Sequence, residues 1–291
     1  MTPIKAIQLR TSSRTFNGLH LDKQILTTIS NYCQTVSTTP QPGEPAPLFE
    51  NITRPTIFLI ADCHTEGNLG TYGVIKGACS YLVMACGESR EEQMLGGYLF
   101  EKVILFCTQL GVDTCWLGGT LTKNEFQVAY EQAHPTGKQR VMIASPAGHR
   151  TPTKRFAERL FRSAISSNKR KPFNTLFSGV TPATDAMFNT LLQGTALDNI
   201  TNSERLALAL ECVRLAPSSR NSQPWRANVR MNSNSSAFSV EFQCTTSNTF
   251  SAIDMGIAFA HFTEATELMN IHGSWTHHLN DEKTITFSSL K

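Results

Sequence analysis

The spacing of apolar positions predicts a first set of helices and strands in the N-terminal part of the chain. Residues 21–36 place apolar side chains at every fourth position, which predicts a helix with one buried face. Continuous apolar runs at 55–63, 81–87 and 141–149 predict buried strands. The segment 96–111 is apolar on nearly every side, so we expect a helix at the centre of the fold.

A second set of elements follows a basic stretch. Residues 203–216 carry apolar side chains at helical spacing and stop before Pro217, which cannot continue a helix. Residues 238–244 alternate like a strand, and 253–275 predict another long, largely apolar helix. The run 150–172 between the two sets is rich in Lys and Arg, and we expect a solvated helix and linker there.

Two pairs of landmarks relate the two sets. Gly97 precedes Trp116 by 19 residues, and Gly256 precedes Trp275 by 19 residues (116 − 97 and 275 − 256). In both intervals an apolar helix leads into a short turn and a tryptophan. This self-similarity indicates an internal duplication. The two related halves are predicted to span 1–172 and 173–291.

Composition narrows the class of protein. Of the 291 residues, 40% are hydrophobic and 17% are charged, which excludes a disordered chain. The formal net charge of +3 gives no basis for a nucleic-acid or anionic-membrane partner. No apolar run approaches the roughly 18 residues of a membrane span, and residues 1–12 lack the apolar core of a signal peptide. We therefore expect a soluble, cytoplasmic protein.

The eight cysteines lie mostly within apolar runs, and none belongs to a CxxC pair or a zinc-type grouping. His277 and His278 are neighbours, and on a strand their side chains would point to opposite faces. We expect free thiols in a reducing compartment and no metal site.

Two polar segments carry the candidate chemistry. Residues 216–225 read APSSRNSQPW, so that short hydroxyl and amide side chains follow a helix end and can line a cleft. The alternative is a polar turn in which Pro224 and Trp225 pack onto the domain. In residues 10–14, RTSSR, two guanidinium groups and a hydroxyl share one face of an extended segment, which suits a phosphate or another delocalised anion. The alternative there is a frayed basic N-terminus.

Taken together, these segments resemble the FMN-dependent nitroreductase family, in which an Arg-x-Ser-x-Arg segment follows the N-terminal helix and a Pro-Ser-Ser-x-Asn-x-Gln-Pro-Trp string ends the next one. TCWLGG (114–119) and ASPAGHR (144–150) resemble later motifs of that family, in the expected order, so the resemblance covers most of the chain. Ordinary members separate the first two motifs by about one helix, whereas here Arg10 and Pro217 lie far apart. The arrangement resembles the fused, single-chain branch of the family, a pseudo-dimer.

The resemblance implies an α+β fold, with a mixed, largely antiparallel sheet flanked by helices and present in two related halves. Helices 96–111 and 253–269 would pack together as the subunit-interface helices of ordinary members do. A monomeric pseudo-dimer is therefore expected, with a homodimer as the alternative.

The resemblance also implies one FMN per chain, bound by residues of both halves. Arg10 and Ser12 would hold the phosphate, and Arg14 would lie against the N1–C2=O edge of the ring, where a cation stabilises the reduced form. Backbone N–H groups at 117–119 would reach N5 and O4. The implied cofactor-binding residues are Arg10, Thr11, Ser12, Arg14, Leu117, Gly118, Gly119, Gly148, Arg155, Pro217, Ser218, Ser219 and Asn221. Lys154 is the alternative to Arg155, and Gln223 and Trp225 are expected to be structural.

The activity implied is an FMN-dependent NAD(P)H oxidoreductase of nitroreductase type. Hydride would pass from NADH or NADPH to flavin N5 and then to a small-molecule acceptor, a nitroaromatic or quinone, by ping-pong kinetics without a side-chain acid or base. The loop 65–73, with Tyr72, would either cover the ring or be a plain surface loop. The alternatives are other chemistry on the same fold (dehalogenation, azoline oxidation, flavin fragmentation) and a non-catalytic flavin-binding or sensing protein.

Overall fold

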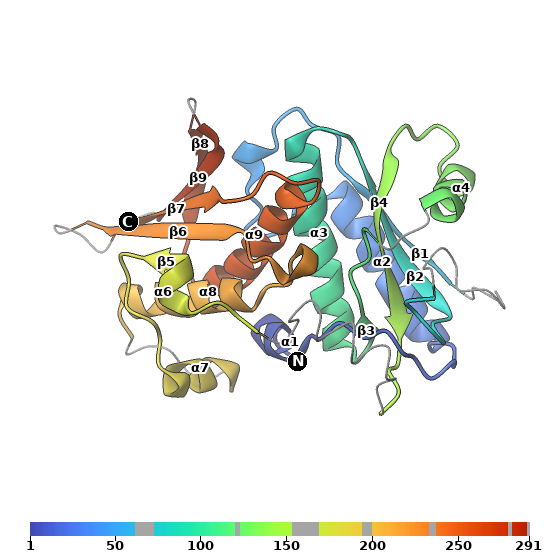
Figure 1. The fold of residues 1–291 in the computed structure, drawn as a ribbon, viewed down its shortest axis with the longest axis horizontal. Helices are drawn as coiled ribbons and strands as arrows, with labels where there is room; N and C mark the ends of the chain where they lie inside the picture. Colours follow the sequence, from blue (N-terminus) through green and yellow to red (C-terminus); the bar gives the residue numbers. More distant parts are fainter. Residues whose placement is uncertain are drawn as a thin grey trace.

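Two sheets lie on either side of a central pair of long helices, α3 (Arg90–Gln109) and α9 (Ser251–Leu268) (Figure 1). The computed structural model describes residues 1–61, 73–119, 123–152, 169–193, 200–232, 237–278 and 281–289. Most of the loop 65–73, including Tyr72, lies outside these residues. None of the helices in the described ranges is long and apolar enough to cross a membrane.

The first sheet has the strand order β1-β2-β4-β3, and all its neighbours are antiparallel. Its strands are β1 (Thr56–Ile60), β2 (Ser80–Cys86), β3 (Asp113–Thr114) and β4 (Arg140–Gly148). Side chains of β2 alternate between two cores: Leu82 and Met84 join the main core with α3 and α2 (Lys23–Thr38), whereas Tyr81 and Val83 pack in a smaller cluster with residues of α4 (Lys123–Ala133). Helices therefore cover both faces of this sheet.

The second sheet repeats that order as β6-β7-β9-β8 and adds a short parallel strand beside β6. Its strands are β5 (Phe177–Ser178), β6 (Trp225–Met231), β7 (Phe238–Cys244), β8 (Gly273–His278) and β9 (Asp281–Ser289). The accompanying helices are α6 (Phe173–Leu176), α7 (Asp185–Leu192) and α8 (Asn202–Leu215). The expected α+β class, with largely antiparallel sheets in two related halves, is confirmed.

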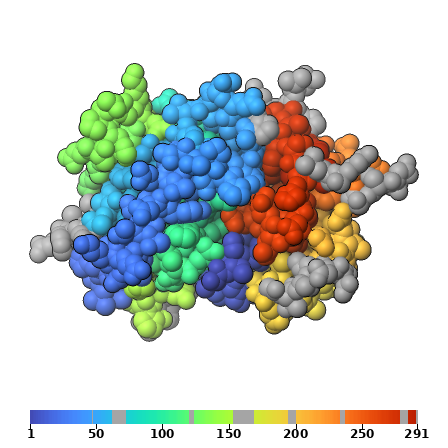
Figure 2. Space-filling view, turned by 180° about the vertical axis from the view of Figure 1, so that it is seen from behind, coloured from blue at the N-terminus to red at the C-terminus, as the bar shows by residue number. Residues whose placement is uncertain are grey.

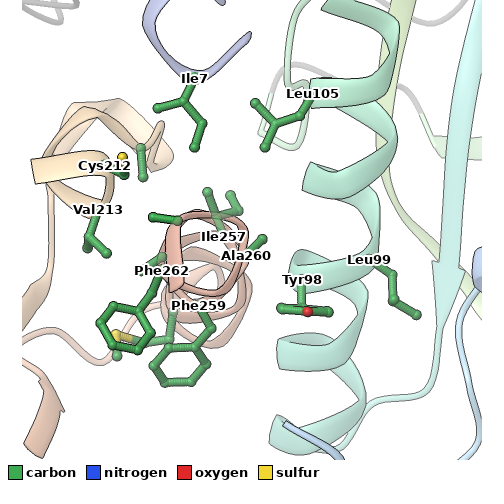
Figure 3. Close-up of a cluster of buried hydrophobic side chains, with 14 of the residues drawn as sticks. Ile7, Tyr98, Leu99, Leu105, Cys212, Val213, Ile257, Phe259, Ala260 and Phe262 are labelled. Atoms are coloured by element: carbon green, nitrogen blue, oxygen red, sulfur yellow. The ribbon is translucent and has the colours of Figure 1, made fainter. Parts of the chain in front are cut away.

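The two halves meet where α3 and α9 cross, as expected of the central helices. A Cβ added to Gly97 would lie 2.2 Å from the carbonyl oxygen of Ile253, and one added to Gly256 would lie 2.0 Å from that of Met94. Each glycine therefore faces the residue three positions before the other, which is the pattern of a pseudo-twofold axis. Figure 3 shows the apolar side chains that α1, α3, α8 and α9 bury around this crossing.

Both central helices end in the same way. Val112 N–H reaches back to Cys107 O (2.9 Å) across Gly111, and Ile271 N–H reaches back to Thr266 O (2.8 Å) across Asn270. These are Schellman caps, whose turning residue takes a left-handed conformation (φ 76° at Gly111, φ 55° at Asn270). The prediction of one helix over 253–275 is therefore wrong, because this cap ends α9 at Leu268 and Trp275 lies on β8.

The repeat keeps a constant offset through this whole region. Gly97 and Gly256, Gly111 and Asn270, and Trp116 and Trp275 are each 159 residues apart (256 − 97, 270 − 111, 275 − 116). This offset lets any residue of α3 be compared with its counterpart in α9.

The N-terminus is ordered and wedged between the halves. Helix α1 (Pro3–Leu9) begins with Thr2 as N-cap, and buries Ile4 and Ile7 against α3, α8 and α9. In Figure 2 the darkest blue residues accordingly lie between surfaces of the two halves. The alternative of a frayed basic terminus is therefore wrong.

Candidate functional site

The segment after α1 is an extended strap (residues 10–16) held by backbone hydrogen bonds. Ser13 N–H donates to Thr114 O (2.9 Å), and Phe16 N–H donates to Lys76 O (2.8 Å). Thr11 Oγ1 accepts from Arg150 at 3.5 Å. The strap therefore runs along β3 towards the end of β4, and its place is fixed by backbone pairing.

Both arginines of the strap are buried. Arg10 has 5% of its side chain exposed, and its Nε and Nη1 make no hydrogen bond, although Nε lies 3.9 Å from the Glu101 carboxylate. Arg14 is 6% exposed. Because buried donors are nearly always paired, the unused Arg10 donors fit a delocalised anion such as a phosphate.

The polar turn of the second half (residues 217–223) follows α8 and has a strained backbone. Arg220, Asn221 and Gln223 all have positive φ (51°, 56° and 47°). Such conformations cost roughly 1–3 kcal/mol each unless the surroundings hold them, and they cluster at functional sites. Here Ser219 N–H donates to Asp254 Oδ1, and Gln223 N–H donates to Ser218 Oγ, both at 2.9 Å.

Residues 169–171 hold this turn through hydrogen bonds, an arrangement that we call the clamp. Arg170 donates to Asn221 Oδ1 (2.5 Å) and to Leu215 O (2.9 Å), while Asn221 Nδ2 donates to Lys169 O (2.8 Å). Lys171 Nζ donates to Ser222 O (2.6 Å). The expectation of a solvated linker is therefore wrong at these three positions, because the end of the basic run supplies partners for an otherwise strained turn.

Gln223 and Trp225 are buried. The Gln223 carboxamide accepts from Lys171 N–H (2.8 Å). Both residues therefore pack as the structural side chains that were expected.

The strap and the turn meet across the two halves. Burial, together with the smaller effect of the positive charges of Arg10 and Arg214, lowers the pKa of Arg170 to about 10. Arg170 therefore lies in the field of Arg10, although 160 residues separate them in sequence (170 − 10). On the other side, a Cβ on Gly118 would lie 2.7 Å from the ring of Phe250, at the start of α9. The first half's strap and WLGG loop (116–119) thus border the second half.

In the WLGG loop, the backbone of Leu117 pairs with the sheet, whereas the backbone at Gly119 is open. Leu117 N–H donates to Ala144 O (2.9 Å), so this amide is engaged in the sheet and is not available to a flavin, contrary to the expectation for 117–119. A Cβ on Gly119 would meet no atom within 4 Å, so the loop is open there. Gly148 packs against Phe16 of the strap. Lys154 and Arg155 lie outside the described residues.

Several polar groups of the turn 217–223 form hydrogen bonds that hold the turn in place. Ser219 N–H and the Asn221 carboxamide are engaged as described above, and Pro217 directly follows the C-cap of α8. Asp254 is buried, with no hydrogen-bond partner at Oδ2, and burial raises its pKa to about 7 against the lowering effect of Ser219 N–H and the Ser222 hydroxyl. Sequence reasoning missed this carboxyl, because it lies in a helix that looks apolar throughout.

Sequence reasoning also missed a buried pair below the strap, Glu101 and His261, each fully buried. The available signal was charge inside a helix predicted to be central, since buried charges need partners. Among the described residues, no three His, Cys, Asp or Glu side chains group as metal ligands.

Comparison with known proteins places the chain in a family. The profile of a family described as "Putative TM nitroreductase" matches residues 3–198 and 191–266. A "putative nitroreductase" of Thermotoga maritima superposes with a TM-score of 0.56 at 17% identity, over 99% of this chain and 93% of its own. A nitroreductase family protein of Clostridium difficile gives a TM-score of 0.40 at 14% identity, over 60% of this chain and 96% of its own.

A nitroreductase with bound FMN from Bacteroides fragilis gives a TM-score of 0.38 at 14% identity, over 53% of this chain and 91% of its own. No curated protein matches the chain. The family profile nevertheless covers most of the sequence, and the fold and the two converging motifs agree with it. The chain belongs to this nitroreductase family.

Proposed function

We propose that the chain is an FMN-dependent oxidoreductase whose single cofactor lies between the strap and the polar turn of the second half. The observation that carries this proposal is Arg10, a buried guanidinium with unused donors in the field of Arg170. Two cations held close together in a partly buried site favour a bound anion. The FMN phosphate supplies such an anion.

The chain's own residues would bind and orient the cofactor. Arg10 and Ser12 would hold the phosphate, and Arg14 would face the polar edge of the ring. Charge-assisted hydrogen bonds of this kind contribute about 1.5–3 kcal/mol each. The open backbone at Gly119 would approach the ring closely, since no side chain intervenes there, and Gly118 leaves room for Phe250 beside it. FMN, when bound, supplies hydride acceptance and electron transfer.

The position related to the strap by the pseudo-twofold axis supports one FMN per chain. With the 159-residue offset, Thr114 beside the strap corresponds to Gly273 on β8 (273 − 114). There the chain places the loop 40–48, whose short turn Ala46–Leu48 packs against β8. We name this place the mirror position.

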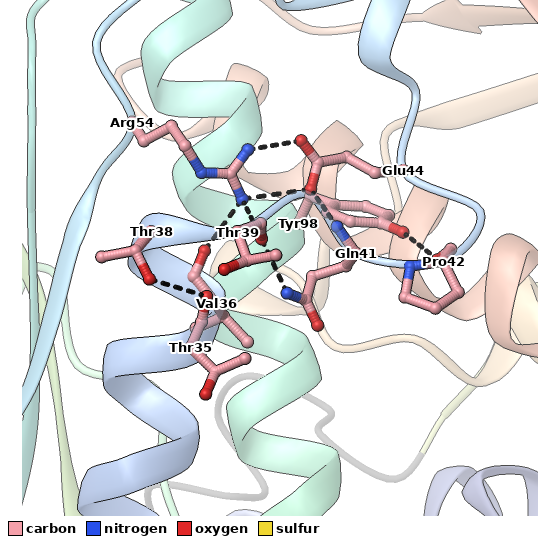
Figure 4. A network of polar contacts seen from close by, with 9 residues as sticks. All are labelled: Thr35, Val36, Thr38, Thr39, Gln41, Pro42, Glu44, Arg54 and Tyr98. Carbon is pink, nitrogen blue, oxygen red and sulfur yellow. Dashed lines mark hydrogen bonds and ion pairs between the residues drawn. The ribbon is translucent and has the colours of Figure 1, made fainter.

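Among the described residues of the mirror position, the guanidinium is that of Arg54, whose Nε makes no hydrogen bond but whose Nη1 and Nη2 are both engaged by the chain. Arg54 donates to Glu44 Oε1 (2.6 Å) and to the carbonyls of Val36 (2.8 Å) and Thr39 (3.1 Å) (Figure 4). A carboxylate of the chain thus already neutralises this cation, which supports a single cofactor site.

NADH or NADPH is the proposed electron donor, and a nitroaromatic or quinone-like molecule is the proposed acceptor, in a ping-pong sequence. The halves 1–172 and 173–291 would replace the two subunits of an ordinary dimer. Because α3 and α9 already pair within one chain, a monomer is the proposed state.

The deciding experiment releases flavin from the purified protein by denaturation and quantifies it per chain. About one FMN per chain, with NAD(P)H oxidation in the presence of a nitroaromatic or quinone, is the expected result. Two FMN per chain would contradict the account of the mirror position. Bound FMN without turnover would indicate a flavin-binding protein, and no FMN after incubation with excess cofactor would overturn the proposal.

A further inference from the structure

Glu101 and His261 form a buried polar pair between α3 and α9, directly below the strap. His261 Nε2 lies 2.8 Å from Glu101 Oε1, and neither residue has any exposed surface. Glu101 Oε2 accepts from the indole N–H of Trp116 at 2.7 Å, and Arg10 Nε lies 3.9 Å from Oε1. The Glu101 carboxylate thus contacts Arg10, which is proposed to bind the phosphate, Trp116 of the WLGG loop, and His261 of the other half.

His261 extends this contact to the helix that carries the polar turn. Its Nδ1 lies 2.9 Å from the carbonyl oxygen of Cys212 in α8. That carbonyl is free for a side chain, because Ala216 N–H donates to Val213 O where the helix ends. His261 therefore caps the C-terminal end of α8, one turn before Pro217.

The hydrogen bonds assign the protons of the pair. A carbonyl can only accept, so His261 Nδ1 carries a hydrogen. Glu101 Oε2 accepts from Trp116, and the 2.8 Å contact between Oε1 and His261 Nε2 places one further hydrogen between these two atoms.

We propose that Glu101 and His261 are positioning residues, which together fix Arg10, the Trp116 loop and the end of α8 in the arrangement that the cofactor site requires. This inference rests on the proposed function for its ligand. The pair reaches all three segments of a site that is split between the halves. Buried polar pairs often contribute little net stability, and this pair connects three segments of the site.

The mirror position supplies a matched control. Lys102, the counterpart of His261 (261 − 102 = 159), forms an ion pair with Glu264 between the same two helices, also largely buried. In the part of the chain that the structure describes, this pair makes no hydrogen bond or ion pair with the strap or the WLGG loop. Glu264→Gln should therefore destabilise the fold and leave FMN affinity within about twofold of the parent.

The test measures the Kd for FMN by quenching of flavin fluorescence, with thermal stability measured in parallel. Glu101→Gln keeps the volume and an acceptor for Trp116 but removes the charge, and we expect the Kd to rise at least tenfold. Trp116→Phe, a change at a partly exposed side chain, should raise it several-fold without unfolding the protein. Unchanged FMN affinity in both variants would overturn the inference.

Two histidine variants separate the two bonds. His261→Asn retains a donor near the place of Nδ1, whereas His261→Gln retains one near the place of Nε2. If His261 acts through its contact with Glu101, His261→Gln should retain most of the FMN affinity of the parent protein, whereas His261→Asn should not. Equal loss in both, matching their loss of stability, would assign a purely structural role and overturn the inference.

The readouts keep this inference distinct from the proposed function. The indole N–H resonance of Trp116, assigned with Trp116→Phe, should move in Glu101→Gln even without flavin. If the parent protein does not bind FMN, the proposed function fails, whatever the resonance does. If the parent binds FMN and the resonance and the Kd are unchanged in Glu101→Gln, only the inference fails.

Discussion

The strap site and the mirror position are built on the same pair of crossed helices and differ in the contacts of the tryptophan that follows each helix. At the strap site, Trp116 directs its indole N–H to the buried Glu101 carboxylate. At the mirror position, the counterpart Trp275 keeps the contact with Phe259 (4.9 Å between ring centroids) that Trp116 makes with Phe100 (4.9 Å), and it also packs against Phe287 at 5.2 Å. A polar connection on one side has an aromatic cluster as its equivalent on the other.

This difference shows what a covalent pseudo-dimer permits. In a twofold homodimer every residue acts at both symmetry-related places, so neither place can change alone. In the fused chain the close crossing at Gly97 and Gly256 keeps its symmetry, because both helices depend on it. Side chains further from the axis have diverged: the counterpart of Glu101 is Ala260 (260 − 101 = 159). Packing is therefore conserved between the halves while the polar interior has specialised.

The largest expected effect concerns Asp254, whose counterpart in α3 is the buried Leu95 (254 − 95 = 159). Burial raises its pKa from 3.8 to about 7, so the folded protein holds a proton that the unfolded chain releases. Stability should therefore fall as pH rises from about 4 to about 7. At about 1.4 kcal/mol per pKa unit, Asp254→Asn should gain up to about 4 kcal/mol at pH 8 and little near pH 4.

Denaturant unfolding of both proteins across this pH range measures the difference. The Asn side chain still accepts from Ser219 N–H, so the comparison isolates the charge. If the free energy of unfolding changed with pH in the same way in both proteins, the pKa of Asp254 would not be raised in the folded protein. Burying Asp254 would then cost no stability at neutral pH.

The next effect tests the symmetry of the crossing. Gly97→Ala and Gly256→Ala would each place a methyl group about 2 Å from a backbone carbonyl of the partner helix, so the helices must separate. Overpacking of this kind costs about 3 kcal/mol, more than the gain in helix propensity. Equal losses in the free energy of unfolding are expected. Gly96→Ala is the control, since its methyl would meet no backbone atom but the flexible Met84 side chain at 3.0 Å and Cys86 Sγ at 3.6 Å.

Arg10 and Arg54 compare the two sides directly through cofactor binding. Arg10→Ala removes buried donors that make no hydrogen bond within the chain, and FMN affinity should fall roughly ten- to hundredfold, the equivalent of about 1.5–3 kcal/mol. Arg54→Ala breaks the ion pair with Glu44 and should lower stability only. FMN titration monitored by fluorescence measures both. Similar losses of affinity in the two variants would mean that the mirror position also binds the cofactor.

How far the sequence alone leads is clear from particular elements. Long periodic or continuous apolar segments, such as those of α2, α3, β2 and β4, were predicted in type and approximate place. The apolar pattern alone carried the last helix on to residue 275, because a left-handed Asn270 terminates α9 and asparagine is a weaker signal than the glycine that ends α3. The resemblance gave the end of this helix as 269, within one residue of Leu268. Short edge strands such as β5 have too few residues to show a period.

The residues of the candidate site also fall into a group that the sequence predicted and a group that it did not. Arg10 and the turn at 217–223 were found because each is a compact local motif. Arg170, Asp254 and the Glu101–His261 pair were missed, because their roles come from contacts with residues far away in sequence. A local pattern therefore identifies groups that meet a ligand more readily than groups that hold those groups in place.

The smallest expected effect concerns the clamp at Arg170. Arg170→Ala removes the donors to Asn221 and Leu215, so the left-handed turn should loosen and FMN affinity should fall about tenfold, or roughly 1.4 kcal/mol. Trypsin should also cleave faster after the exposed Arg220 within the turn. The control is Arg140→Ala, which removes an exposed ion pair with Glu88 and should change neither measurement. Unchanged cleavage and affinity in Arg170→Ala would mean that the turn keeps its conformation without Arg170, held by Lys171, Asp254 and Ser218.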